Sequence, residues 1–293
     1  MGVADEFVSF KNQYNIDQDR IASISRRYRR ITKQLNKDFR SLDSETAHSL
    51  YVGSYGRDTA ARGVSDLDVG YVLPNALYAQ YNAYQTNGQS ALLQAVRNSI
   101  RNTYPTSEIA GDGQVVVIKF DDGIKFEILP VFINTAGTWT YPNSNSGGSW
   151  LVCNPRAEIE AIKTRNLAAN RNLKHLCRMM RIWRDHNDVP MSGALIDTLA
   201  YQFIEYWENR DKSFLYHDYL ARDFLRYLAN QPSQQTYWRM PGSGSYVWTN
   251  GNFQSKALVD YKLAVDACNL QGDENAVQRR RKWRLVFGSK FPE

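Results

Sequence analysis

The stretch from Val52 to Val69, V-G-S-Y-G-R-D-T-A-A-R-G-V-S-D-L-D-V, places the strongest constraint on what this chain can form. Gly53 and Ser54 lie in a run typical of a loop, and Asp66 and Asp68 stand one residue apart in a short strand-like run. In a strand, residues i and i+2 share a face, so the two carboxylates lie side by side. The stretch therefore predicts a loop that leads into a strand with an acidic face.

A second strand-forming region lies further along the chain. Residues Val115–Phe120 are β-branched and apolar, residues 121–123 read D-D-G, and Ile124–Phe132 is again apolar, so the segment predicts a β-hairpin. In its second strand, alternation places Ile124, Phe126 and Ile128 on one face and Lys125, Glu127 and Leu129 on the other. Glu127 is therefore a carboxylate that a strand presents.

The rest of the chain has mainly helical periodicity. Apolar residues recur at steps of three and four from about Ala4 to Ser49, which predicts one long N-terminal helix, and again from about Gln89 to Asn102. The segment Asn134–Pro155 is rich in Gly, Ser and Asn and predicts a long loop between two halves. Beyond it, four apolar stripes predict a mostly helical region. The predicted domains are residues 1–150 and residues 151–293, in an α+β fold.

Composition limits the classes of function. The chain has 293 residues, of which 43% are hydrophobic, so it can bury a large core. A formal net charge of +6 favours anionic partners such as nucleotides or nucleic acid. Acids near the N-terminus and the lack of an apolar run of about 20 residues argue against a signal peptide and a membrane span. We expect a cytoplasmic protein that has no membrane contact.

The acidic strand and the loop predict a chemistry together. Repulsion between Asp66 and Asp68 is relieved by a hard cation, and Glu127 from a neighbouring strand would complete a site for two Mg²⁺ ions, with Mn²⁺ as the alternative metal. Gly53 allows a phosphate to approach the backbone, and Ser54 adds a hydroxyl donor. This combination indicates phosphoryl transfer from a nucleoside triphosphate.

The motifs also resemble those of a known family. G-S-Y-G-R-D-T followed by S-D-L-D is similar to the signature of the DNA polymerase β-like nucleotidyltransferases. The runs F-E-I-L-P-V-F, G-G-S-W-L-V-C-N-P, L-K-H-L-C-R-M-M-R-I-W-R and K-W-R-L-V-F-G-S-K-F-P resemble the bacterial second-messenger oligonucleotide or dinucleotide synthetases, which are relatives of cyclic GMP-AMP synthase and oligoadenylate synthetase. The resemblance spans about Tyr51 to Pro292.

The resemblance implies a fold and a set of site residues. The fold is a polymerase β-like core with a twisted mixed sheet and a long N-terminal helix, joined to a helical C-terminal half, with the active site in the cleft between them. By motif position, the metal-binding acids are Asp66, Asp68 and Glu127, and the residues that contact nucleotide phosphates are Gly53, Ser54, Lys174 and Ser192. The third acid of this family is often aspartate, so Glu127 is a departure.

The resemblance also implies an activity. We expect a Mg²⁺-dependent enzyme that makes a cyclic di- or trinucleotide from ATP and a second nucleoside triphosphate, releasing pyrophosphate, in anti-phage signalling. The product would act on a separate effector. A regulatory protein and a nucleic-acid activator are candidate partners, and the sequence leaves open whether either switches the enzyme on. Candidate contacts with the bases, which could equally be packing residues, are Tyr55, Trp139, Tyr141, Trp150 and Asn166.

Three alternatives remain open at this point. A linear oligoadenylate-type synthetase, or a nucleotidyltransferase that modifies RNA or protein, would need the same acids. A chain without catalytic activity could instead be an RNA-binding sensor that uses the basic runs Arg26–Arg30 and Arg279–Lys282. The clustered acids argue against a pure RNA binder, because they would face RNA phosphates.

Overall fold

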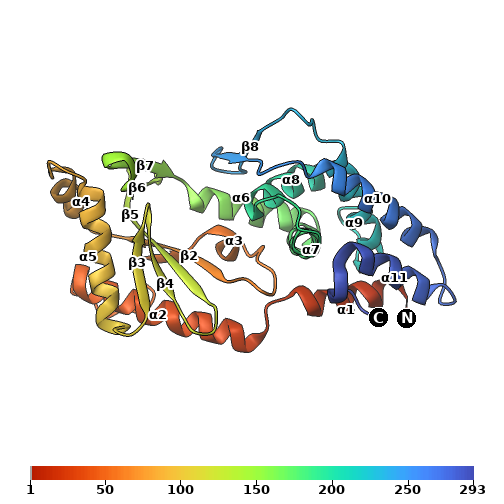
Figure 1. The fold of residues 1–293 in the computed structure, drawn as a ribbon, viewed down its shortest axis with the longest axis horizontal. Coiled ribbons are helices and arrows are strands. Elements are labelled where there is room, and N and C mark those ends of the chain that lie inside the picture. Colours follow the sequence, from red (N-terminus) through yellow and green to blue (C-terminus); the bar gives the residue numbers. More distant parts are fainter. Residues whose placement is uncertain (1) are drawn as a thin grey trace. The chain divides into compact units, whose positions relative to one another are not determined.

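The protein divides into two compact units, and a computed structural model describes its residues 2–293 (Figure 1). The sheet unit comprises Asp17–Gly56 and Gly63–Arg156. The helical unit comprises the N-terminal segment up to Ile16, the short segment Arg57–Arg62, and Ala157–Glu293. The division into domains of residues 1–150 and 151–293 stays a prediction. Within the described range, no helix has the length and apolar character that crossing a membrane requires.

A mixed seven-stranded sheet forms the centre of the sheet unit. Its main path runs β1-β2-β5-β4-β3, and β6 pairs with both β5 and β7. Strands β2 and β5 are parallel, and the other pairs are antiparallel. The strands are β1 (Ser49–Tyr51), β2 (Asp66–Val72), β3 (Glu108–Asp112), β4 (Val115–Lys119), β5 (Lys125–Ile133), β6 (Trp139–Asn143) and β7 (Ser149–Cys153). The helical elements are α2 (Gln18–Arg40), α3 (Gly53–Gly56), α4 (Asn75–Asn82), α5 (Gly88–Thr103) and the 3₁₀ turn η1 (Asn145–Gly147).

One face of this sheet is covered by α2 and α5. Both helices have apolar residues at helical spacing, so each can bury one side against the strands. Leu67, Val69 and Phe126 point from β2 and β5 into this core, which orients the alternate residues of the same strands away from it. The helix residues of the core are Ile24, Tyr28, Ile31 and Leu35 from α2, and Leu92, Leu93, Val96 and Ile100 from α5.

The prediction of one continuous N-terminal helix is wrong. The helix breaks between α1 (Val3–Tyr14) and α2, and only α2 belongs to the sheet unit. Asn15 and Asp17 have extended backbone, and the Asp17 carboxylate accepts a hydrogen bond of 2.8 Å from the Arg20 amide. Asp17 is therefore an N-cap that starts a new helix, although the apolar repeat continues across the break.

The predicted long loop at Asn134–Pro155 is also wrong, because it contains the hairpin of β6 and β7. The two strands contain aromatic, β-branched and aliphatic residues, which favour strands: Trp139, Thr140 and Tyr141 in β6, and Leu151 and Val152 in β7. The run Ser144–Gly148 forms the turn between these strands. The predicted hairpin of β4 and β5 and the helix α5 are confirmed.

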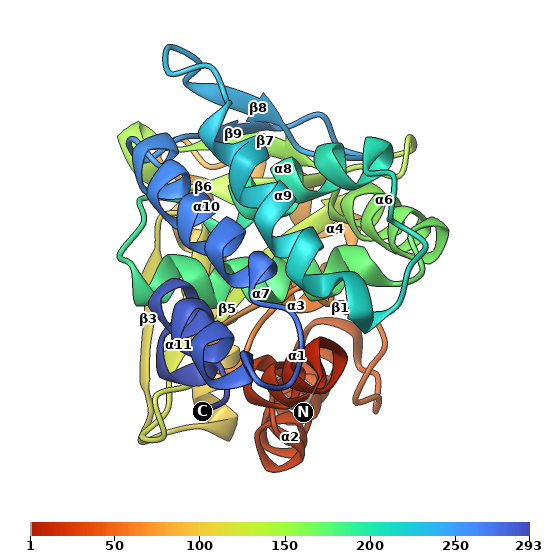
Figure 2. The same cartoon turned by 90° about the vertical axis from the view of Figure 1, so that its right-hand side faces the viewer.

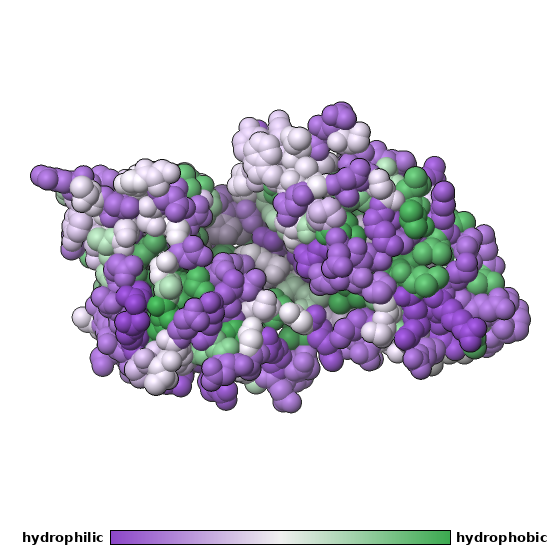
Figure 3. Space-filling view, viewed as in Figure 1, coloured by the Kyte–Doolittle hydropathy of each residue, from purple (hydrophilic) through white to green (hydrophobic). Residues whose placement is uncertain are grey.

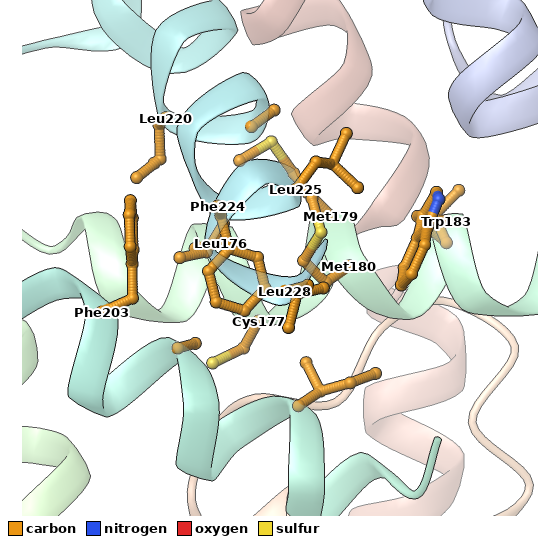
Figure 4. Close-up of a cluster of buried hydrophobic side chains, with 14 of the residues drawn as sticks. Leu176, Cys177, Met179, Met180, Trp183, Phe203, Leu220, Phe224, Leu225 and Leu228 are labelled. Atoms are coloured by element: carbon orange, nitrogen blue, oxygen red, sulfur yellow. The ribbon is translucent and has the colours of Figure 1, made fainter. Parts of the chain in front are cut away.

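The helical unit packs its helices around one large apolar core. In Figure 4, side chains of α7, α8 and α9, among them Leu176, Phe203 and Phe224, point toward one another. Figure 2 shows α7, α9, α10 and α11 of this unit. Its elements are α1, α6 (Pro155–Ala168, from Ala157 on), α7 (Asn172–His186), α8 (Gly193–Tyr206), η2 (Phe214–Tyr216), α9 (His217–Ala229), β8 (Tyr237–Arg239), β9 (Tyr246–Trp248), α10 (Gln254–Asn269), α11 (Ala276–Phe287) and η3 (Gly288–Lys290). The helical character is confirmed, whereas the short hairpin of β8 and β9 was not predicted.

Candidate active site

Three acids and a lysine share one face of the strands β2 and β5. The two strands run parallel, with Asp66 opposite Lys125 and Asp68 opposite Glu127. Residues in register on adjacent strands point to the same side of a sheet, and these four alternate with the buried residues of the opposite face. The predicted side-by-side arrangement of Asp66 and Asp68 and the strand position of Glu127 are therefore confirmed.

Lys125 is the site residue that the sequence argument did not assign. Its Nζ lies 2.7 Å from Glu127 Oε1 and 3.3 Å from Asp66 Oδ1. The hydrogen bond to Glu127 raises the pKa of Lys125, against a smaller effect of burial, so its ammonium stays protonated at neutral pH. Within residues 2–293, no three acidic, His or Cys side chains are grouped so that they could hold a metal ion as they stand. Lys125 supplies positive charge to two of the acids.

The glycine loop packs directly against the acidic strand. The Val52 amide donates to the Asp68 carbonyl at 2.9 Å, and the Gly56 amide donates back to the Val52 carbonyl at 2.9 Å, which closes the short helix α3. Gly53 has a φ of +58°, and a Cβ built at this position would lie 1.9 Å from Asp68 Oδ2. Only glycine permits both this backbone conformation and this close approach.

Substitution of Gly53 by Ala is therefore expected to displace the Asp68 carboxylate. A shift of about 1 Å in a positioned group can cost on the order of 10²-fold in rate, so we expect a loss of that size in pyrophosphate release from nucleoside triphosphates. The measurement is the steady-state rate at saturating nucleotide, with the melting temperature recorded for each variant.

Gly63→Ala is the matched control for this substitution. Gly63 also has a positive φ, +97°, but a Cβ there would have nothing within 4 Å. It therefore carries the backbone strain of the change without the collision, and its rate should stay near that of the unaltered chain. Equal losses in both variants would show that strain, and not the contact with Asp68, is responsible.

Lys174 and Ser192 lie in the helical unit. Lys174 Nζ lies 3.0 Å from Asp58 Oδ2, and Arg178, one turn later on α7, contacts the same carboxylate. Ser192 is the N-cap of α8, where its hydroxyl accepts a hydrogen bond of 3.1 Å from the Leu195 amide. Each residue thus has a structural contact, and their roles with nucleotide phosphates stay predictions.

A buried polar network was missed by the sequence argument. Asp197 on α8 accepts hydrogen bonds from Arg181 Nη1 at 2.7 Å, Thr59 Oγ1 at 2.7 Å and Arg57 Nε at 3.0 Å. Burial raises the pKa of Asp197, but the charges of Arg181 and Arg57 outweigh it and hold the pKa below its usual value. The R-D-T end of the loop motif is thereby bound to the helical unit. The local signal was an aspartate within the apolar run of α8.

All five candidate base contacts have packing or capping contacts in the fold. Trp150 packs against Tyr78 with ring centroids 4.9 Å apart, and Tyr141 packs against the small core that includes Trp139. Trp139 is fully buried and lies so close to Gly70 that a Cβ there would be 2.2 Å from the ring. Asn166 is buried, and its side-chain oxygen Oδ1 accepts a hydrogen bond from the Lys174 backbone amide at 3.0 Å. Tyr55 packs against Tyr51 with ring centroids 4.8 Å apart. Trp139 is therefore not available for base stacking.

The basic runs proposed for RNA binding are partly used inside the protein. Arg27 pairs with Asp122 at 2.9 Å and covers the Phe120 ring, and Arg30 covers the Tyr104 ring. Arg279 is buried and pairs with Glu6 at 2.7 Å. These arginines are committed to internal contacts, which weakens the case for an RNA sensor.

Solved structures with similar folds include proteins from three bacteria. Escherichia coli MS115-1 CdnC with ATP has a TM-score of 0.69 at 17% identity, and the match covers 99% of this chain and 98% of that chain. A second structure, of the E. coli MS115-1 CdnC:HORMA-deltaN complex, has a TM-score of 0.68 at 16% identity with the same two coverages. Apo Vibrio cholerae DncV has a TM-score of 0.72 at 11% identity, with coverage of 97% and 93%. Bradyrhizobium diazoefficiens CdnG with GTP has a TM-score of 0.68 at 10% identity, with coverage of 99% and 96%. At these identities the likeness establishes the fold, so the predicted α+β polymerase β-like architecture is confirmed.

A family model supplies the identification at the level of sequence. The comparison with curated proteins gives no match. The model of the Second Messenger Oligonucleotide or Dinucleotide Synthetase domain matches residues 1–166, which is more than half of the chain and includes the glycine loop and all three acids. The chain therefore belongs to the Second Messenger Oligonucleotide or Dinucleotide Synthetase family and is an enzyme of the nucleotidyltransferase class.

Proposed function

We propose that this enzyme joins nucleoside triphosphates into a cyclic di- or trinucleotide. The observation that carries the proposal is the acidic face of β2 and β5 with the glycine loop packed on Asp68. In each step a ribose hydroxyl oxygen forms a bond to an α-phosphorus, the bond from that phosphorus to the β-phosphate oxygen breaks, and pyrophosphate leaves. The hydroxyl proton passes to a carboxylate oxygen of the acidic face.

Asp66, Asp68 and Glu127 would hold divalent metal in this reaction. Carboxylate oxygens from two adjacent strands are the hard ligands that Mg²⁺ prefers, and Mn²⁺ accepts the same set. The Lys125 ammonium at Asp66 and Glu127 supports this assignment, because these acids already stabilise a cation. When bound, two such ions would neutralise the triphosphate and make the ribose hydroxyl more acidic.

The other predicted contacts are assigned to the triphosphate. Gly53 and Ser54 would bind it through the loop backbone and the serine hydroxyl, since Gly53 leaves the loop without a side chain at Asp68. Lys174 and Ser192 would contact the donor phosphates from the helical unit. Lys174 would exchange its contact with the exposed Asp58 for a phosphate, which is a stronger charge-assisted acceptor.

The substrates and the biological setting are also proposals. The neighbours described with ATP and with GTP support ATP and a second nucleoside triphosphate as substrates. The complex described for CdnC supports control by a regulatory protein, and a nucleic acid activator is the alternative. We place the enzyme in the cytoplasm, where its product would act on a separate effector in anti-phage defence.

The experiment that tests this proposal is product analysis. The pure protein is incubated with all four ribonucleoside triphosphates and Mg²⁺, and the products are treated with phosphatase and analysed by mass spectrometry. A cyclic product has no terminal phosphate, so we expect a product that resists phosphatase. A linear product, or pyrophosphate release without a product joining two nucleotides, would overturn the cyclic assignment.

A further inference from the structure

A groove lies between α10 and α11, outside the acidic face and the glycine loop. The two helices follow each other in the chain and pack together, and each gives buried residues such as Ala267 and Trp283 to the core of the helical unit. Between their outer sides is a hollow of about 820 Å³, lined among others by Leu270, Leu285 and Arg281. In Figure 3, apolar patches lie among hydrophilic atoms over this part of the helical unit.

The groove has an excess of positive charge. Arg281, Lys282 and Arg284 line it, against the single carboxylate of Asp266. Lys282 Nζ lies 2.9 Å from Asp266, and Arg284 lies 3.4 Å from Glu293 and donates to the Phe291 carbonyl at 3.0 Å. The acids of both ion pairs are exposed, so these pairs can exchange with other partners. Arg281 is exposed and has no acidic partner within residues 2–293.

The basic run divides between the interior and the groove. Arg279 and Arg280 both turn inward to the buried carboxylate of Glu6, at 2.7 Å and 3.4 Å. The next two residues, Arg281 and Lys282, line the groove. The run therefore gives two arginines to a buried contact and two cations to the groove.

Apolar side chains are exposed beside these cations. Leu285 is 55% exposed and lines the groove, and Val277 is 52% exposed and lines a second hollow of about 280 Å³, which Arg281 and Arg284 also line. Val277, Arg281 and Leu285 stand four residues apart, so they form one stripe along α11. Exposed apolar side chains alternating with cations are typical of a binding surface for an amphipathic partner.

We propose that this groove, defined by Leu270, Arg281, Lys282, Arg284 and Leu285, binds an acidic amphipathic helix of a protein partner. The twelve residues of α11 extend about 18 Å, enough for about three turns of a bound helix. Apolar residues of the partner would cover Leu270 and Leu285, and its carboxylates would pair with the three cations. The exposed side chains of Leu285 and Val277 favour an amphipathic helix over RNA, because a phosphate backbone offers them no apolar surface.

The test uses a fluorescent peptide of about 15 residues, long enough to match the groove, with Leu at helical spacing, three Glu beside the Leu stripe and Ala elsewhere to favour a helix. Its twin has Lys in place of every Glu, and a single-stranded RNA of similar length is the third probe. Fluorescence anisotropy with the full chain should show binding of the acidic peptide below about 1 mM, an affinity that a small interface reaches. Binding of the basic twin or of RNA at least as tight as that of the acidic peptide would overturn the proposal, as would no binding.

Variants locate the binding on the groove. Arg281→Glu and Leu285→Ser should each weaken binding of the acidic peptide by roughly tenfold, since each removes one charge or apolar contact. Lys163→Glu is the matched control, because Lys163 is an exposed cation on α6 in the same unit. The affinity of this variant for the acidic peptide should fall only by the small amount that the change in net charge of the chain causes. Unchanged affinity in both groove variants would show that the peptide binds elsewhere.

Discussion

Asp66→Asn is expected to lower the rate of pyrophosphate release by on the order of 10³-fold, because charge stabilisation by bound metal is worth several kcal/mol and each 1.4 kcal/mol is about tenfold. Asparagine keeps the volume of the side chain but not its charge. Asp66 is 55% exposed and leaves no core cavity, so the melting temperature should stay close to that of the unaltered chain. The rate is measured by a coupled pyrophosphate assay.

The control for this variant is Asp121→Asn. Asp121 lies in the exposed turn between β4 and β5. Its substitution by Asn therefore removes the same charge from the same unit without changing a residue of the acidic face. Its rate should be unchanged. If Asp66→Asn kept more than about a tenth of the activity, Asp66 would not be a metal ligand of the kind proposed. A fall in melting temperature with Asp66→Asn would indicate a role in the fold instead.

Asp197→Asn is expected to destabilise the protein by about 3–5 kcal/mol, the usual cost of removing one partner from a buried ion pair. Arg181 is 4% exposed and Asp197 is its acidic partner at 2.7 Å, so the substitution leaves a buried guanidinium without a counter-charge. Urea unfolding followed by circular dichroism measures the change. Asp211→Asn removes an exposed ion pair with Lys212 and should cost less than about 1 kcal/mol.

The effect of Asp197 should depend on pH in a defined direction. Its pKa is lower in the folded protein than its ordinary value, so the folded protein binds fewer protons at this carboxyl than the unfolded chain. The stabilisation is fully present above the unfolded pKa of about 4 and is lost as the pH falls toward the folded pKa. The difference in unfolding free energy between the two proteins should therefore be constant at neutral pH and shrink below about pH 4. A difference that grew on acidification would contradict the assignment.

Local patterns were sufficient to predict the acidic strand and its partner. Alternation placed Asp66 with Asp68, and placed Glu127 opposite the buried face of its strand, because side chains in a strand point to alternate sides whatever the strand pairs with. Lys125 was predicted on the same face as Glu127. Its contact with Asp66 depends on the register of β2 and β5, and no local pattern contains that register.

The errors have local causes too. The apolar repeat continues through the break at Asp17, so periodicity hid the capping residue that starts α2. The turn residues around Ser144–Gly148 dominated the prediction for the segment that contains β6 and β7, although its flanks favour strands. In both places a stronger sequence signal masked a weaker one beside it.

The sequence by itself determined the chemistry of the motif, because the amino-acid types and their spacing of one or two residues already decide which groups share a strand or a turn. The tertiary structure alone decided how the stretch from Val52 to Val69 is divided between the two units. Gly53 packs on Asp68 in the sheet unit, whereas Arg57 and Thr59 bind Asp197, about 140 positions further along the chain, in the helical unit. Contacts at such separations form only when the core is assembled, since burial then makes a charged group pair with the partner that the fold brings to it.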